Sequence, residues 1–140
     1  MTTEPDRTTA LPVPALTANG EAQEHIEALR YGRLLLPQCE ACGAIIWYPR
    51  SFCPQCGTNK VRWIEATGDG RVYSFTVVRK GAGAYAASVP YVVAYVELAE
   101  GPRVLTNIVG DPADIRIDAP VTAVYDRADS GEAILRFRSS

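Results

Sequence analysis

The spacing of apolar side chains changes once along the chain, from a helical to a strand-like period. Over residues 20–31 the apolar positions Ala22, Ile26 and Leu29 recur every three or four residues, which predicts a short amphipathic helix. We expect this helix to form most of a segment of residues 19–35. Its apolar stripe is narrow, so it requires another part of the molecule to pack against.

From residue 61 onward the pattern follows the two-residue period of β-strands, in segments rich in Val, Tyr and Ile. The sequence predicts five strands, at residues 70–78, 90–98, 103–110, 120–126 and 133–139. The first is expected to turn Tyr73, Phe75 and Val77 toward one face. Because a closed barrel hides the edges of short strands, we predict an OB-type five-stranded barrel over residues 61–140. An SH3-like barrel or an open sandwich is the alternative.

All four cysteines lie in one short stretch, CEACGAIIWYPRSFCPQCG. They form two CxxCG units, Cys39 with Cys42 and Cys53 with Cys56, in which one tight turn can aim both sulfurs at a point. The glycine after each unit can adopt the positive φ angle that such a turn requires. Two facing units make a tetrahedral four-thiolate site, so residues 36–60 predict a zinc ribbon. The fold class is therefore mainly β, with a helix, a small zinc ribbon and then the barrel.

Other interpretations of the cysteines stay open. Disulfide bonds are disfavoured in a reducing compartment, and two CxxC units together more often share a metal than act in redox chemistry. Spacing alone does not separate zinc from iron, as in rubredoxin. A segment of about 20 residues buries too little apolar surface to fold alone, and structural zinc contributes on the order of 10–16 kcal/mol in finger peptides. Four protein thiolates leave no open coordination position, so we expect Zn²⁺ with a structural role.

The loop between the two cysteine pairs, AIIWYPRSF, carries more large apolar side chains than a short loop can bury by itself. These are Ile46, Trp47, Tyr48, Pro49 and Phe52. One interpretation is that they pack on the barrel and the helix. The other is that Trp47, Tyr48 and Arg50 form part of a partner-binding surface, because interface centres are enriched in aromatic residues and Arg.

The sequence contains no evident self-sufficient active site. His25, the single histidine, falls on the predicted helix beside Glu24 and Glu27 and is expected to be a solvated helix residue. Neither a GxSxG motif nor a Walker-type GxxxxGK[ST] motif is present. We therefore expect no catalytic residues in this chain.

A weaker candidate site lies after the first predicted strand. The small-residue stretch GAGAYAAS, residues 81–88, predicts a mobile loop open to a ligand or a partner. Arg79 and Lys80, just before it, could contact a ligand phosphate. The alternative is that both are ordinary charges at the end of a strand.

Charge and composition limit the classes of partner. The formal net charge is −2, which gives no electrostatic footprint for nucleic acid and no polybasic membrane surface. No apolar run approaches the roughly 20 residues that span a bilayer. Residues 1–18 are rich in Thr, Pro and Ala without a period, which predicts a disordered leader. They include Glu4 and Asp6 and lack a continuous apolar core, so no signal peptide and a cytoplasmic location are expected.

With helix, four-cysteine ribbon and barrel in this order, the chain resembles the small acyl-CoA-associated proteins in which a rubredoxin-like zinc ribbon precedes an OB-fold. The resemblance covers residues 20–140. It rests on the segments GRLLLPQCEACG, YPRSFCPQCG, GDGRVYSFTVV, PYVVAYVELAEGPRVLTNIVG, APVTAVYD and LRFR. Members of that family are typically accessory subunits that bind thiolase-like or hydratase-like enzymes acting on acyl-CoA substrates.

The resemblance implies a hetero-oligomer in which a partner enzyme holds the catalytic residues and this chain helps to form or stabilise the acyl-CoA site. The reactions of such pairs include thiolysis, aldol cleavage and acyl transfer. The resemblance also implies that Cys39, Cys42, Cys53 and Cys56 are zinc ligands. Relatives often carry a Phe-Trp pair in the helix where this chain has His25 and Ile26, so a contact made by those aromatics is altered here.

Two other function classes are alternatives to this one. A single-stranded nucleic-acid-binding module is suggested by the combination of OB-fold and zinc ribbon. Residues 61–140 carry nine Arg or Lys against ten Asp or Glu, however, and a groove that follows phosphates requires a basic surplus. An independent acyl-CoA enzyme with its site in the barrel mouth is the third class.

Overall fold

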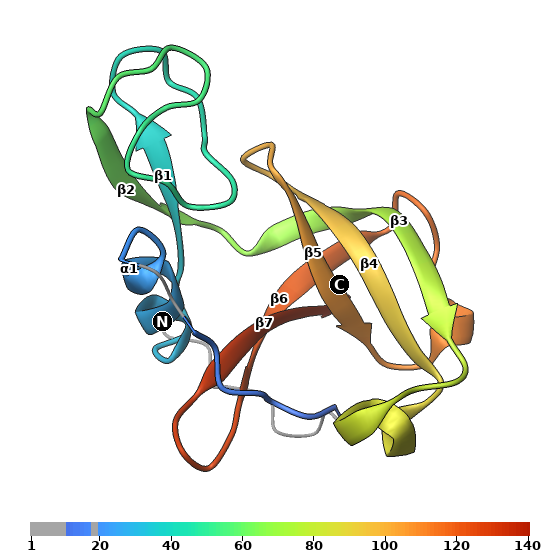
Figure 1. The fold of residues 1–140 in the computed structure, drawn as a ribbon. Helices are drawn as coiled ribbons and strands as arrows, with labels where there is room; N and C mark the ends of the chain where they lie inside the picture. The colour runs from blue at the N-terminus through green and yellow to red at the C-terminus, as the bar shows by residue number, and fades with distance from the viewer. Residues whose placement is uncertain (1–10, 18–19) are drawn as a thin grey trace.

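The computed structural model describes residues 11–17 and 20–140, which form an α-helix, a two-stranded sheet and a closed five-stranded barrel (Figure 1). In chain order the elements are α1 (Gln23–Leu29), β1 (Leu34–Cys39), β2 (Val61–Ala66), β3 (Asp69–Val78), the 3₁₀ helix η1 (Gly83–Ser88), β4 (Tyr91–Leu98), β5 (Arg103–Val109), the 3₁₀ helix η2 (Pro112–Asp114), β6 (Pro120–Arg127) and β7 (Ala133–Ser139). The predicted fold class is confirmed. Within these residues no helix has the length and apolar character needed to cross a membrane.

The barrel closes in the order β3-β4-β5-β7-β6, and β6 returns to pair with the start of β3. Its pairings are antiparallel except the short parallel one between β5 and β7, which joins Ile108 to Phe137 and Val109 to Arg138. Closure through one short parallel contact is the OB arrangement, so the open sandwich is excluded. The five barrel strands coincide closely with the five predicted segments, because alternating apolar residues and turn residues mark them in the sequence.

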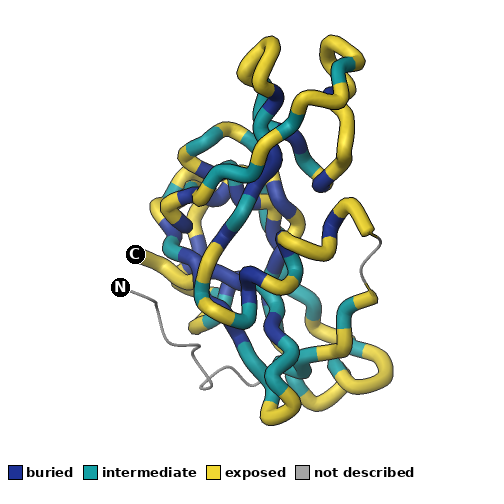
Figure 2. Tube along the Cα trace, turned by 90° about the vertical axis from the view of Figure 1, so that its left-hand side faces the viewer, coloured by how far each residue is buried: buried dark blue, intermediate teal, exposed yellow. Residues whose placement is uncertain are grey.

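Buried side chains fill the barrel and continue beyond it. Phe137, Val96 and Val104 are buried inside the barrel, and the same apolar cluster extends into β1 through Leu34 and Leu36. Figure 2 shows buried positions along the barrel wall, whereas the two cysteine-bearing loops at the top of the view are mostly exposed. The base of the ribbon therefore shares the core of the barrel.

One predicted strand face is wrong. The sequence placed Tyr73 on the same face as Phe75 and Val77. A β-bulge between Val72 and Ser74 shifts the register of β3 against β4, so Tyr73 is exposed while Phe75 and Val77 pack against the core. An extra residue in a strand leaves no mark in a two-residue hydrophobic pattern.

The ribbon contains a sheet that the sequence did not predict. β1 and β2 form an antiparallel ladder that runs from the pair Leu34–Ala66 to the pair Cys39–Val61. Strand β2 thus pairs with β1 and with no barrel strand among the described residues. The sequence LLLPQC of β1 begins with a continuous apolar run and contains a Pro. It therefore lacks the alternation of apolar and polar residues that marks a half-buried strand.

The N-terminal part lies against the barrel. Helix α1 is shorter than predicted, and it buries His25, Ala28 and Leu29. Residues 11–17 follow the barrel wall, where the backbone carbonyl of Pro12 accepts a hydrogen bond from Arg136 at 2.6 Å. Most of the predicted leader, residues 1–10 and 18, lies outside the described residues.

Candidate metal centre and surrounding surfaces

The two CxxCG units fold into matching turns. The backbone N–H of Gly43 donates to the carbonyl of Cys39 at 3.0 Å, and that of Gly57 donates to the carbonyl of Cys53 at 2.8 Å. Both glycines have positive φ angles, +78° and +80°, which other residues adopt only with strain. The positive φ angles predicted for Gly43 and Gly57 are therefore confirmed.

The turns bring the four sulfurs together. The ligand atoms of Cys39, Cys42, Cys53 and Cys56 all lie within 4.8 Å of one another. The Sγ–Sγ distances are 3.6 Å for Cys39–Cys56 and for Cys42–Cys53, and the four are free cysteines. Four thiolates placed tetrahedrally at 2.3 Å from a zinc ion stand about 3.8 Å apart. The arrangement therefore fits a metal ion held tetrahedrally by the four sulfurs.

Hydrogen bonding prepares one of these sulfurs for metal binding. The backbone N–H of Cys42 donates to the Sγ of Cys39 at 3.4 Å. This hydrogen bond, with further help from neighbouring amides and thiols, lowers the pKa of Cys39 to about 6. The thiolate, which is the metal-binding form, is then the prevailing form of Cys39 at neutral pH.

His25 is buried, contrary to the sequence expectation of a solvated residue. Its Nδ1 donates to the carbonyl of Leu35 at 2.9 Å, and its ring meets the rings of Trp47 and Tyr48 edge-on, at centroid distances of 5.1 and 6.3 Å. Burial lowers the pKa of His25, so its imidazole is neutral at pH 7. The helical period predicts that Ile26 faces the core. The ribbon loop instead covers its neighbour His25, through Trp47 and Tyr48.

The loop between the cysteine pairs divides its apolar residues between the two interpretations. Ile46 is buried beneath the metal cluster, and Trp47 packs against the barrel core. Tyr48, Arg50 and Phe52 remain exposed. Of the predicted surface residues Trp47, Tyr48 and Arg50, the first is half-buried and only the latter two are exposed.

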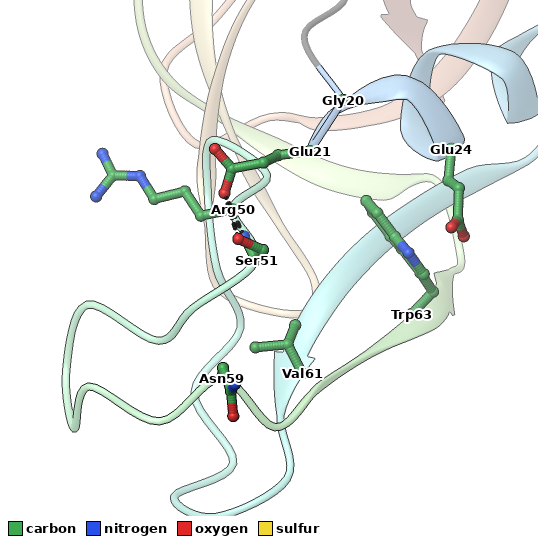
Figure 3. A pocket seen from close by; sticks show the side chains of 8 residues that line it. All are labelled: Gly20, Glu21, Glu24, Arg50, Ser51, Asn59, Val61 and Trp63. Carbon is green, nitrogen blue, oxygen red and sulfur yellow. Dashed lines mark hydrogen bonds between the residues drawn. The ribbon is translucent and has the colours of Figure 1, made fainter.

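A hollow of 270 Å³ is lined by this loop, the start of the helical segment and β2 (Figure 3). The carboxylate of Glu21 accepts two hydrogen bonds from Ser51, from the backbone N–H at 2.5 Å and from the hydroxyl at 2.8 Å. These bonds lower the pKa of Glu21. Figure 3 shows Trp63 on β2 lining the hollow opposite this pair, with Arg50 pointing away from it. The contact joins the ribbon loop to the turn that precedes α1.

The predicted phosphate contacts lie elsewhere. Arg79 and Lys80 follow the end of β3 and are exposed, and the predicted loop after them forms the 3₁₀ helix η1. They are on the barrel, apart in the fold from the four cysteines (Figure 1). The structure does not bring the two groups of predicted site residues together.

A buried charged network was not predicted at all. Arg136 on β7 is fully buried and forms an ion pair with Asp126 on β6. Its remaining N–H groups donate to Asn107 at 3.2 Å and to the hydroxyl of Tyr85 at 3.3 Å, besides the contact to Pro12. This network is hard to predict from the sequence, because β7 is covered on both faces at Arg136. One of the covering segments, residues 11–17, has no hydrophobic period.

Two family models match the chain in the order of its two parts. The model described as "ChsH2, rubredoxin-like zinc ribbon domain" matches residues 27–61, and the model described as "ChsH2, C-terminal OB-fold domain" matches residues 63–126. The chain belongs to the ChsH2 family. The predicted resemblance is confirmed, since all four cysteines fall within the first ChsH2 match and β3, β4 and β5 fall within the second.

Relatives of this ChsH2-family chain carry subunit and scaffold names. A "Probable enoyl-CoA hydratase alpha subunit" of Thermomonospora curvata is 38% identical over 128 residues, which are 91% of this chain. A "DUF35 domain-containing scaffold protein" of Methanocaldococcus jannaschii is 35% identical over 92 residues, or 64% of this chain. A solved structure described as "Ltp2-ChsH2(DUF35) aldolase" superposes with a TM-score of 0.81 at 36% identity and covers 89% of this chain and 98% of that chain.

The lengths of these proteins differ. The chain spans 39% of the length of the Thermomonospora relative and 65% of that of the Methanocaldococcus relative. The ribbon and barrel of the ChsH2 family are thus one part of the longer hydratase subunit.

Proposed function

We propose that this chain is a non-catalytic accessory subunit of an acyl-CoA-processing enzyme. It binds a thiolase-like enzyme (an aldolase, a thiolase or an acyltransferase) or a hydratase-like enzyme, and it helps to form or stabilise the acyl-CoA site of that partner. The observation that carries the proposal is the match to 98% of a chain in a structure whose description pairs ChsH2 with Ltp2 as an aldolase. The subunit and scaffold names of the two curated relatives point the same way.

The side-chain chemistry supports a non-catalytic role. In the part of the chain that the structure describes, His25 is enclosed by aromatic rings, and its Nδ1 is engaged with the backbone. Burial raises the pKa of Tyr125 to about 12, so its hydroxyl stays protonated at neutral pH. A general base requires an accessible group whose pKa lies near the working pH, and neither residue qualifies.

The metal centre has a structural role in this proposal. Cys39, Cys42, Cys53 and Cys56 hold one Zn²⁺, which fixes the loop that carries Tyr48 and Arg50. The zinc-ribbon family match and the sulfur geometry support this assignment. Metal analysis of the purified protein should find one zinc per chain, whereas an iron centre would colour the protein through thiolate-to-iron charge transfer.

Two surfaces have roles in this proposal. Trp47, Tyr48 and Arg50 contribute to the partner contact, because Tyr48 and Arg50 are exposed and the half-buried ring of Trp47 packs beside that of Tyr48. Arg79 and Lys80 are exposed cations beside η1, and they contact a phosphate of the acyl-CoA when the partner is bound.

Affinity purification from the native host tests the proposal. A tagged chain should recover a thiolase-like or hydratase-like subunit in near-equal amount, identified by mass spectrometry. The isolated chain should show no turnover of acyl-CoA substrates, and the reconstituted pair should show it. Recovery of the chain alone from gently lysed cells, or turnover by the chain alone, would contradict the proposal.

A further inference from the structure

The outer wall of the barrel carries a second cluster of exposed apolar side chains, distant in the fold from the ribbon loop. We call the barrel face the outward surface of β3, β4 and β5 formed by Tyr73, Ser74, Thr76, Val93, Tyr95 and Leu105. Tyr73, Tyr95 and Leu105 are 49%, 45% and 62% exposed. Exposed apolar residues scattered singly require no explanation, but contiguous ones mark interaction sites.

The strand register makes these residues contiguous. Tyr95 lies opposite Leu105 on one side and opposite Ser74 on the other, next to the bulged Tyr73. Adjacent strands lie about 4.8 Å apart, so the three large side chains form a single row across three strands. Together they expose on the order of 300 Å² of apolar surface, the size of a functional patch on a monomer.

The barrel face is shaped as well as apolar. One hollow of 250 Å³ lies among Phe75, Val93, Tyr95 and Leu105, and a second of 290 Å³ lies beside it toward Tyr91. Both hollows are lined by Val93 and Leu105, which form the ridge between them. Two adjacent hollows separated by an aliphatic ridge suit apolar side chains that project from a protein surface.

The charges at the border indicate the chemistry of the occupant. Arg103 lies over the ring of Tyr73 at 3.8 Å from its centroid, and its Nε donates to Glu97 at 2.9 Å. This ion pair neutralises the charged edge, and the face itself carries no charged side chain. A nucleic-acid strand requires unpaired cations along its path, so an uncharged protein surface is the better match.

We propose that the barrel face docks an uncharged, apolar patch of the partner enzyme subunit, so that the chain holds its partner through the barrel as well as the ribbon loop. This inference rests on the proposed function, because it names the surface by which the accessory subunit binds. The bulge in β3 has a role in it. It turns Tyr73 outward, into the row with Tyr95 and Leu105.

The test uses matched exposed residues. The enzyme subunit identified by copurification is expressed, purified alone and titrated with variants of the full chain by calorimetry. Leu105→Lys should weaken binding at least tenfold, because it places a charge at the centre of the apolar row. Ile117→Lys is the control, since Ile117 is 59% exposed and lies outside the barrel face. It should bind like the wild type, and both variants should keep the wild-type melting temperature.

A second measurement does not depend on substitution. Hydrogen exchange of the wild-type chain should slow at residues 73–76 and 93–95 when the enzyme subunit is added. If the Leu105→Lys variant and the wild type bound the enzyme subunit with equal affinity, and no such protection appeared, the barrel face would not be the docking surface. The proposed function would remain intact. Absence of wild-type binding would instead refute the proposed function and this inference together.

Two other outcomes would also overturn the inference. If Leu105→Lys abolished self-association of the wild-type chain, measured by light scattering, the occupant would be a second copy. If the variant abolished binding of a generic single-stranded oligonucleotide, the occupant would be nucleic acid. Either result would assign the barrel face to another partner class.

Discussion

The cysteine end of the ribbon and the barrel reach a folded state by different means. At the cysteine end the buried apolar cluster consists of Cys39, Cys53 and Ile46 with two partly buried neighbours. The barrel buries a large cluster that reaches from Phe137 to Leu34 on β1. So small a group at the cysteine end cannot balance the entropy of ordering two loops, whereas the barrel core can. We therefore expect the order of the loops to depend on a metal.

The boundary between these two regimes lies inside the ribbon. Leu34 and Leu36 at the base of β1 belong to the barrel cluster, but Cys39 at the end of the same strand belongs to the cysteine cluster. A six-residue strand thus connects the two regimes. We expect that each region can be disturbed separately. The two tryptophans, Trp47 and Trp63, both lie in the ribbon, so tryptophan fluorescence reports on it. The far-ultraviolet circular dichroism reports mainly on the barrel, which holds most of the strands.

The largest expected effect comes from removing the metal. Cys42→Ser should abolish stoichiometric zinc binding, a loss on the order of 10 kcal/mol of metal-coupled folding energy at the cysteine end. Hydrogen exchange should become fast over the loops that follow Cys39, and the dichroism of the barrel should persist. Gln55→Ser, an exposed change inside the second cysteine unit, is the control and should retain zinc. A single cooperative loss of all β signal would show that the whole chain depends on the metal.

The next largest effect comes from the buried ion pair of the barrel. Arg136→Met leaves the carboxylate of Asp126 buried without this cation and should cost about 3–5 kcal/mol in the free energy of unfolding. Urea titration followed by dichroism measures it, and the zinc content should stay at the wild-type value. Adding Asp126→Leu should restore much of the loss, because the buried carboxylate that Arg136 faces is then gone as well. An unchanged urea midpoint in the single variant would mean that the pair does not stabilise the barrel.

A matched pair of core truncations locates the boundary. Leu34 and Ile46 are both almost fully buried, but they lie on opposite sides of it. Leu34→Ala should lower the urea midpoint seen by dichroism, at a cost of about 2–5 kcal/mol. Ile46→Ala should leave that midpoint in place and speed the loss of zinc to a chelator. Identical behaviour of the two variants in both measurements would refute the division.

The sequence predicted the parts of this molecule that rest on local chemistry. The cysteine spacing with Gly43 and Gly57 identified the metal centre, because the ligands and the turns are encoded in one short stretch. The barrel strands followed from their alternation. The exposure of Tyr73, the burial of His25 and the network of Arg136 could not be predicted, since each depends on a bulge or on a segment distant in sequence that covers it.

The smallest expected effect concerns His25, which couples the helix to the ribbon loop. Burial lowers its folded pKa below the ordinary value of 6.5, so only the unfolded chain gains a proton as the pH falls through 6.5. Stability is therefore fully present above that pH and declines below it until the folded pKa is reached, by at most about 1.4 kcal/mol per pH unit.

Urea titrations of the wild type and of His25→Phe between pH 7.5 and 5, followed by tryptophan fluorescence, isolate this contribution, because the cysteines and all other groups titrate in both proteins. The variant should lose less stability on acidification than the wild type. Parallel pH profiles would mean that the ring is accessible to protons, and that the ribbon loop does not seal it against α1.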